Sequence, residues 1–166
     1  AYKPLTLKYL DVIPSRFSHK AYNEDIFNLL ERITCDIAYI DPPYNSRQYI
    51  ANYHLLETIA KYDNPKIKGK TGIREYGDKE KSVFCIKNEV QGAFLKLLTE
   101  LKAKYIVMSY NSEGIISKEQ IIKIMKDVGI KKIKLYKIPY RRFKSNNNST
   151  KNSVIEYIFT GLKESD

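Results

Sequence analysis

Two short apolar runs, each ended abruptly by polar residues, constrain the fold of this chain more than any other feature. The runs are Ile37–Ile40 and Tyr105–Met108. Continuous apolar runs of this length are typical of strands that are buried on both faces of a parallel sheet. An Asp-Pro-Pro-Tyr tetrapeptide, Asp41–Tyr44, follows the first run, and Ser109 follows the second. Because proline has no N–H to donate to a strand ladder, the first strand is expected to end there.

Helices are expected around these runs, because apolar residues recur there at three- and four-residue spacing. The predicted helices cover residues 25–33, 53–61, 89–103 and 118–128, and Gly129 suits the end of the last one. Two further strands are predicted over residues 130–138, where apolar and charged residues alternate, and over residues 154–159, with a polar turn at residues 146–150 between them.

The order of these elements predicts a three-layer α/β fold with a mostly parallel sheet and a C-terminal antiparallel hairpin. The 166 residues suit a single domain, 1–166. Residues 63–81 contain three glycines and many charges, so we expect an exposed, mobile loop there. Ligands bind beyond the carboxyl ends of the strands in such sheets, and Asp41 and Ser109 are expected at those ends.

The net charge of +10 favours a polyanionic partner, with nucleic acid as the first expectation. Residues 131–151 hold many of the basic side chains and no acidic one, and Tyr136, Tyr140 and Phe143 are interleaved with them. This mixture suits a groove that follows phosphates and stacks bases. A solvated basic face with tyrosines at a sheet edge fits the same segment equally well.

Other functional classes find little support in the sequence. No apolar run is long enough to cross a bilayer, and no signal-peptide pattern opens the sequence, so no membrane partner is expected. Cys35 and Cys85 have no metal-ligand spacing. We expect both to be small core residues in a reducing compartment, the cytoplasm, and we expect no metal site.

The residues of Asp41–Tyr44 suit a planar ring that bears an amino group. Asp41 supplies a carboxylate, the two prolines stiffen the turn and leave carbonyl groups without neighbouring N–H donors, and Tyr44 supplies a flat ring. Acceptors aimed at the amino hydrogens favour a pyramidal nitrogen whose lone pair can react. A base in a duplex would have to flip out to reach them. The alternative is a rigid turn that merely ends a strand.

The tetrapeptide and the strand before it resemble motif IV of the amino-directed adenine DNA methyltransferases. The longer string DPPYNSRQYIANYHLLETIAKYD (Asp41–Asp63) is similar to the Dam-like, type II restriction–modification branch of that family. VMSYNSEGIIS (Val107–Ser117) and YRRFKSNNNSTKNSVIEYIF (Tyr140–Phe159) are similar to its downstream strand and its C-terminal hairpin. The resemblance covers nearly the whole chain from Lys20 onward. It implies a Rossmann-like class I methyltransferase fold.

The resemblance also implies roles for single residues. Asp41 and the Pro42 carbonyl would hold the adenine amino group, Pro43 would keep the turn rigid, and Tyr44 would stack on the flipped base. The implied DNA contacts are Asn45, Arg47, Gln48, Tyr49, Tyr110, Asn111, Arg141, Arg142 and Lys144. His54, at the start of a helix, is expected to be structural.

The resemblance further implies S-adenosylmethionine as cofactor. Asp25 would accept from the amino group of the cofactor's adenine, Ile26 would lie against that ring, and Asp41 would border the same site. From the residues alone, a carboxylate favoured by the dipole at a helix N-terminus is the alternative for Asp25.

The family's Phe-x-Gly-x-Gly cofactor loop is missing before motif IV, so the first strands of the sheet are expected to be absent. The chain would then be the C-terminal catalytic portion of a longer enzyme or one piece of a split enzyme. We expect it to bind S-adenosylmethionine weakly or not at all by itself. We also expect exposed apolar surface where the first strands should pair, which the missing N-terminal portion, a partner subunit carrying the loop, or a second copy would cover.

The sequence therefore predicts an adenine-specific methyltransferase that acts on double-stranded DNA in a restriction–modification system. Two alternatives stay open. One is a non-catalytic DNA-binding portion or subunit of such an enzyme, which the missing loop and the basic segment favour. The other is an amino-methyltransferase for guanine in RNA, since such enzymes share the short motif.

Overall fold

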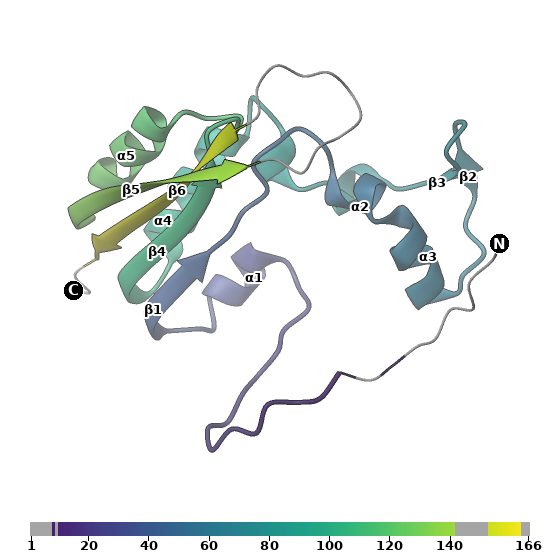
Figure 1. The fold of residues 1–166 in the computed structure, drawn as a ribbon, viewed down its shortest axis with the longest axis horizontal. Coiled ribbons are helices and arrows are strands. Elements are labelled where there is room, and N and C mark those ends of the chain that lie inside the picture. Colours follow the sequence, from purple (N-terminus) through teal and green to yellow (C-terminus); the bar gives the residue numbers. More distant parts are fainter. Residues whose placement is uncertain (1–7, 9, 142–152, 164–166) are drawn as a thin grey trace.

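The computed structural model describes residue 8, residues 10–141 and residues 153–163 (Figure 1). The helices are α1 (Ile26–Leu30), α2 (Tyr49–Asn52), α3 (His54–Lys61), α4 (Val90–Glu100) and α5 (Lys118–Asp127), with short 3-10 helices η1 (Asp78–Glu80) and η2 (Val83–Cys85). The strands are β1 (Cys35–Ile40), β2 (Ile67–Lys68), β3 (Ile73–Arg74), β4 (Ala103–Asn111), β5 (Lys131–Arg141) and β6 (Ser153–Leu162). No helix among these residues is long and apolar enough to cross a membrane.

The main sheet has the strand order β1-β4-β6-β5. Strand β1 pairs with β4 in parallel, whereas β6 pairs antiparallel with both β4 and β5. The strands β1, β4 and β5 therefore run in one direction, but two of the three pairings are antiparallel because β6 lies between β4 and β5. The predicted C-terminal hairpin is confirmed, and the expectation of a mostly parallel sheet holds for strand direction but not for pairing.

One face of this sheet carries the core. Helices α4 and α5 pack on it, and Leu30 of α1 joins the same apolar cluster. Ile106 and Met108 of β4 and Phe159 of β6 are fully buried there. They lie on the covered face because side chains alternate along each strand.

The opposite face is bare among the described residues. Ile37, Tyr39, Tyr105, Tyr136 and Ile138 are between 45% and 64% exposed. The pairings Ile37 with Tyr105 and Tyr39 with Val107 place these apolar side chains on one face. The expectation that Ile37–Ile40 is buried on both faces is therefore wrong for this chain. The described residues build two layers, not three, because their helices cover only one side.

Residues 49–81 form a projection that we call the arm, which extends from the end of the sheet where β1 and β4 finish (Figure 1). It contains α2, α3 and a hairpin of β2 and β3. Two hydrogen bonds close its base: the Gln48 amide donates to the Ser82 carbonyl and accepts from the Ser82 N–H, at 3.2 and 2.8 Å. Within it, Arg74 is buried and pairs with Asp63 at 2.7 Å. The segment predicted as a loop thus contains short regular elements.

Candidate active site

Asp41 follows β1 directly and is held from the neighbouring strand. The Ser109 hydroxyl donates to Asp41 Oδ1 at 2.7 Å, and the Tyr39 hydroxyl lies 3.1 Å from Ser109 Oγ as a donor. Asp41 is exposed, and within the described part of the chain no cation pairs with it. Neutral donors therefore orient this carboxylate and leave its charge uncompensated, so it can serve as an acceptor at the site.

Tyr44 is fixed through its backbone, while its ring stays partly exposed. Its carbonyl accepts from the Ile115 N–H at 2.8 Å and from the Tyr110 hydroxyl at 3.4 Å. The Tyr110 ring meets the Tyr44 ring edge-on, with centroids 6.5 Å apart. The tetrapeptide is therefore braced by the end of β4 and the segment that follows it.

Gly114 makes room for the ring of Tyr110. A Cβ at position 114 would lie 2.0 Å from Tyr110 Cε1, which no side chain can tolerate. Sequence reasoning placed Ser109 at the same strand ends as Asp41 but did not identify Gly114 or Ile115 as parts of the site. The signal for them was weak, because it lay in the predicted loop that follows the second apolar run.

Asp25 and Asp41 line the same hollow, which has a volume of about 660 Å³. Its lining includes Asp25, Ile26, Ile40, Asp41, Pro42 and Pro43. Asp25 also caps α1, since its Oδ1 accepts from the Phe27 N–H at 2.9 Å. The capping role expected as the alternative is thus present, and it places the same carboxyl group at the wall of the hollow. The structure therefore brings the predicted cofactor residues at Asp25 close to the predicted catalytic residues at Asp41, which are sixteen positions apart in the sequence.

The predicted DNA contacts that follow the tetrapeptide have different environments. Arg47 is exposed, and its N–H donates to Asn45 Oδ1 at 2.9 Å. The Gln48 amide is occupied by the bonds that close the arm. Tyr49 is about half exposed and stacks on Tyr53 with ring centroids 5.6 Å apart. Arg47 and Tyr49 are thus accessible to a ligand, whereas the amide of Gln48 is engaged.

Tyr110 and Asn111 are turned inward. They are 2% and 6% exposed, and the Asn111 side chain donates to Glu156 Oε1 at 2.6 Å and accepts from the Glu113 N–H at 2.8 Å. Burial raises the pKa of the Tyr110 phenol, which keeps it neutral near pH 7. A DNA contact by either residue stays a prediction, and it would require these side chains to become exposed first.

The remaining predicted contacts lie at or beyond the end of β5. Arg141 is the last residue of that strand, and Arg142 and Lys144 lie outside the described residues. Strand β5 runs in the same direction as β1 and β4. It therefore ends on the same side of the sheet as Asp41, where the carboxyl ends of these strands lie.

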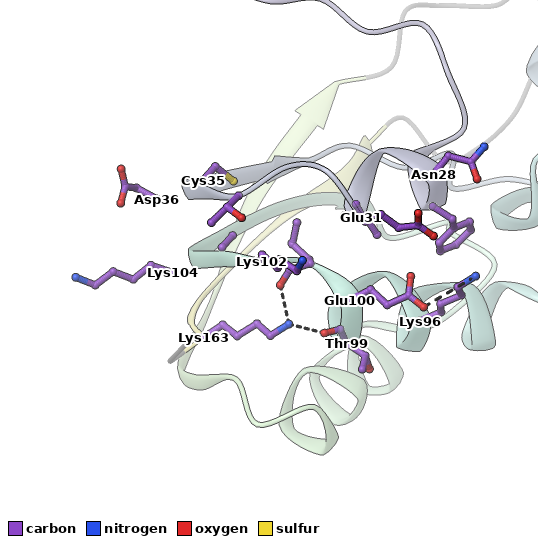
Figure 2. A pocket seen from close by; sticks show the side chains of 15 residues that line it. Asn28, Glu31, Cys35, Asp36, Lys96, Thr99, Glu100, Lys102, Lys104 and Lys163 are labelled. Atoms are coloured by element: carbon purple, nitrogen blue, oxygen red, sulfur yellow. Dashed lines mark hydrogen bonds and ion pairs between the residues drawn. The ribbon is translucent and has the colours of Figure 1, made fainter. Parts of the chain in front are cut away.

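A second hollow, of about 1030 Å³, lies at the opposite end of these strands (Figure 2). Lys163 lines this hollow, and its Nζ donates hydrogen bonds to the carbonyl oxygens of Leu98, Thr99 and Leu101 at 2.7 to 2.8 Å. These are carbonyls from the last turn of α4, which have no partner within the helix. The lysine therefore closes a helix end, and this larger hollow has no contact with the Asp41 side chain.

The geometry defines an α/β protein with an acceptor-rich hollow at the carboxyl end of a strand. Residues 3–124 match the sequence model of the D12 class N6 adenine-specific DNA methyltransferases. The chain therefore belongs to this family. No solved structure matches the chain.

Named relatives agree with this assignment. The chain is 47% identical over 156 residues to the type II methyltransferase M.FokI of Planomicrobium okeanokoites, a match that covers 93% of this chain and 24% of the relative. It is 42% identical over 165 residues to the type II methyltransferase M.NlaIII of Neisseria lactamica, a match that covers 94% of this chain and 48% of the relative. It is 39% identical over 156 residues to the modification methylase StsI of Streptococcus sanguinis, a match that covers 93% of this chain and 24% of the relative. The chain thus spans between about a quarter and about half of the length of these relatives.

Proposed function

We propose that this chain forms the reactive part of an enzyme that methylates the exocyclic amino nitrogen of adenine in double-stranded DNA, with S-adenosylmethionine as methyl donor, in a cytoplasmic restriction–modification system. One observation carries the proposal. The carboxyl groups of Asp25 and Asp41 line one hollow, and the braced Tyr44 follows Asp41 by three residues. Family membership supports the reaction type.

The residues of the hollow fit S-adenosylmethionine. Ile26 and Ile40 offer apolar contacts for an adenine ring, and Asp25 keeps an acceptor oxygen beside the one that caps α1. The Asp41 carboxylate suits a ligand that carries positive charge on sulfur. Bound there, the cofactor would supply a methyl carbon that the neighbouring positive sulfur makes electrophilic.

Asp41 would act on the target base as a hydrogen-bond acceptor. Its Oδ1 is held by Ser109, so Oδ2 is the oxygen available for one amino hydrogen. The carbonyl of buried Pro42 accepts from no donor among the described residues and would take the other hydrogen. Both contacts strengthen as the nitrogen becomes pyramidal and its lone pair is released for attack. The nitrogen then loses one proton, which Asp41 would pass to solvent.

Tyr44 would hold the flipped base. Extruding a base costs a few kcal/mol, and stacking on an aromatic ring returns about 1–3 kcal/mol. The Ile115 and Tyr110 contacts to its carbonyl keep the ring in place before the base arrives, so less ordering is needed on binding.

A further polypeptide segment would complete the site. The seven glycines of the chain include no Phe-x-Gly-x-Gly loop, so the loop would come from a longer chain, a partner subunit or a second copy. The bare sheet face and the exposed Leu55, Leu56 and Ile59 of α3 are apolar surfaces that such a segment could cover. Helices on that face would give the three-layer, Rossmann-like arrangement.

The missing loop also favours a second candidate, a DNA-binding portion without catalysis. Transfer of a labelled methyl group to DNA separates the two. The chain, co-expressed with the gene immediately upstream so that the missing loop can be supplied, is expected to mark adenine in host DNA. Asp41→Ala should abolish the mark, whereas the control Asp36→Ala, which changes an exposed carboxylate earlier on β1, should retain it. A mark that persists in Asp41→Ala would refute the assigned role, and an unmarked genome with intact DNA binding would favour the second candidate.

A further inference from the structure

The β2–β3 hairpin of the arm concentrates positive charge. Residues 66–74 include Lys66, Lys68, Lys70 and Arg74 and no acidic residue. Lys66 and Lys70 are exposed, and neither forms an ion pair with any described residue. Lys68 pairs with Glu75 at 2.5 Å, but both side chains are largely exposed, so solvent weakens this pair and a stronger anion could displace it.

The hairpin also has a shape that lets a polyanion approach. Gly69 and Gly72 have φ of 70° and 64°, which gives a tight turn, and nothing lies within 4 Å of a Cβ built at Gly69. A hollow of about 400 Å³ beside the hairpin is bordered by Lys68, Lys81 and Glu75, and the lysines pair with Glu75 and Asp78. The tip is therefore open, and its unpaired positive charge comes from the exposed Lys66 and Lys70.

The base of the arm is joined to the chain close to the reactive residues. Its base is closed by the bonds between Gln48 and Ser82, and Gln48 is four residues beyond Tyr44. The Arg74–Asp63 pair ties the hairpin to the end of α3. The arm and the end of β5 both lie where the parallel strands of the sheet reach their carboxyl ends, beside Asp41 (Figure 1).

We propose that the arm binds double-stranded DNA outside the target base, with Lys66, Lys68 and Lys70 contacting phosphates. This rests on the proposed function, since a duplex whose base reaches Tyr44 would continue past the edge of the sheet. Charge complementarity selects the partner: DNA carries one negative charge per about 1.7 Å of helix axis, and the hairpin offers unpaired cations. The arm would thus fix the register of the duplex and leave base recognition to other contacts.

Salt-dependent binding tests this proposal. The affinity for a fluorescein-labelled duplex is measured by fluorescence anisotropy at increasing KCl concentrations. The wild-type chain is compared with the variant Lys66→Ala/Lys68→Ala/Lys70→Ala. The matched control is Lys102→Ala/Lys123→Ala/Lys126→Ala, which removes the same charge from exposed positions away from the arm. The arm variant should flatten the log–log salt slope by about two to three, because each phosphate contact contributes about 0.9. Lys66→Arg/Lys68→Arg/Lys70→Arg should restore the slope.

The outcomes distinguish this proposal from the proposed function. Equal slopes for the arm variant and the control would overturn the arm proposal while leaving methyl transfer untouched. A flattened slope without methyl transfer even on co-expression with the gene immediately upstream would support the arm and contradict the enzyme. Failure of the wild-type chain to bind the duplex would overturn the arm proposal outright, whatever the transfer assay shows.

Discussion

Ser109 fixes Asp41 across a strand boundary, because its hydroxyl donates to Asp41 Oδ1 at 2.7 Å while the backbone of Ile40 pairs with Met108. The two residues are 68 positions apart in sequence. The orientation of the carboxylate therefore depends on the register of β1 against β4 and on one neutral hydrogen-bond donor.

Loss of the Ser109 hydroxyl should slow methyl transfer more than it weakens DNA binding. A hydrogen bond to a charged group contributes about 1.5–3 kcal/mol, so Ser109→Ala should lower kcat by about tenfold to a hundredfold. Ser109→Thr keeps the hydroxyl and should recover most of the rate. Tyr39→Phe removes only the outer donor and should cost less. Steady-state kinetics with KM unchanged would support this positioning role; a rise in KM alone would contradict it.

Adding one methyl group at position 114 should disturb Tyr110. Gly114→Ala would force its Cβ into the ring, so the free energy of unfolding should fall by about 1–3 kcal/mol. Gly92→Ala is the matched control: it lies within α4, has open space around its Cβ, and should stabilise the chain by about 0.5–1 kcal/mol. Urea denaturation gives both values. Equal effects of the two substitutions would show that the ring moves aside without cost.

Acid should loosen the arm before the sheet. The hydrogen bond from Arg74 lowers the pKa of Asp63, so the ionised carboxyl stabilises the folded arm at pH values above the ordinary aspartate pKa. This contribution is lost as the pH falls through the lowered pKa. NMR resonances of Ile67 and Ile73 should therefore shift below about pH 4 while those of β4 persist. Asp63→Asn should remove this pH dependence. Simultaneous loss of both sets of resonances would contradict a separate arm transition.

Removal of the Lys163 ammonium should destabilise the end of α4. Its three carbonyl acceptors would lose their donor in Lys163→Met, and the expected loss is about 1–3 kcal/mol of unfolding free energy. Lys102→Met, at an exposed position near the same hollow, should leave stability nearly unchanged. Methyl transfer per folded molecule should be unaffected by Lys163→Met, and a selective loss of transfer would point to a ligand at this hollow.

Local patterns were enough to predict the four strands of the main sheet and most helices. Ile37–Ile40 and Tyr105–Met108 were located because short apolar runs flanked by polar residues are typical of strands in an α/β sheet. The bare face could not be predicted, since the run that contains Tyr39 has the same composition whether or not a helix covers it.

Features that depend on contacts distant in sequence could not be predicted. The bonds of Ser109 to Asp41 and of Gln48 to Ser82 join residues 68 and 34 positions apart. Strands β2 and β3 have two residues each, too few for a periodic pattern, so the hairpin was interpreted as a loop. Tyr53 separates α2 from α3, and no proline or glycine marks that break.

Strand β1 is one of the two outermost strands of the main sheet, and among the described residues it has a ladder partner on one side only. Edge strands fray first, so its amides should exchange with solvent deuterium faster than those of β4. The reactive carboxylate thus directly follows an edge strand of the scaffold. Any polypeptide that aligns with the vacant border of β1 would damp this fraying and would thereby govern how often the carboxylate is correctly aimed.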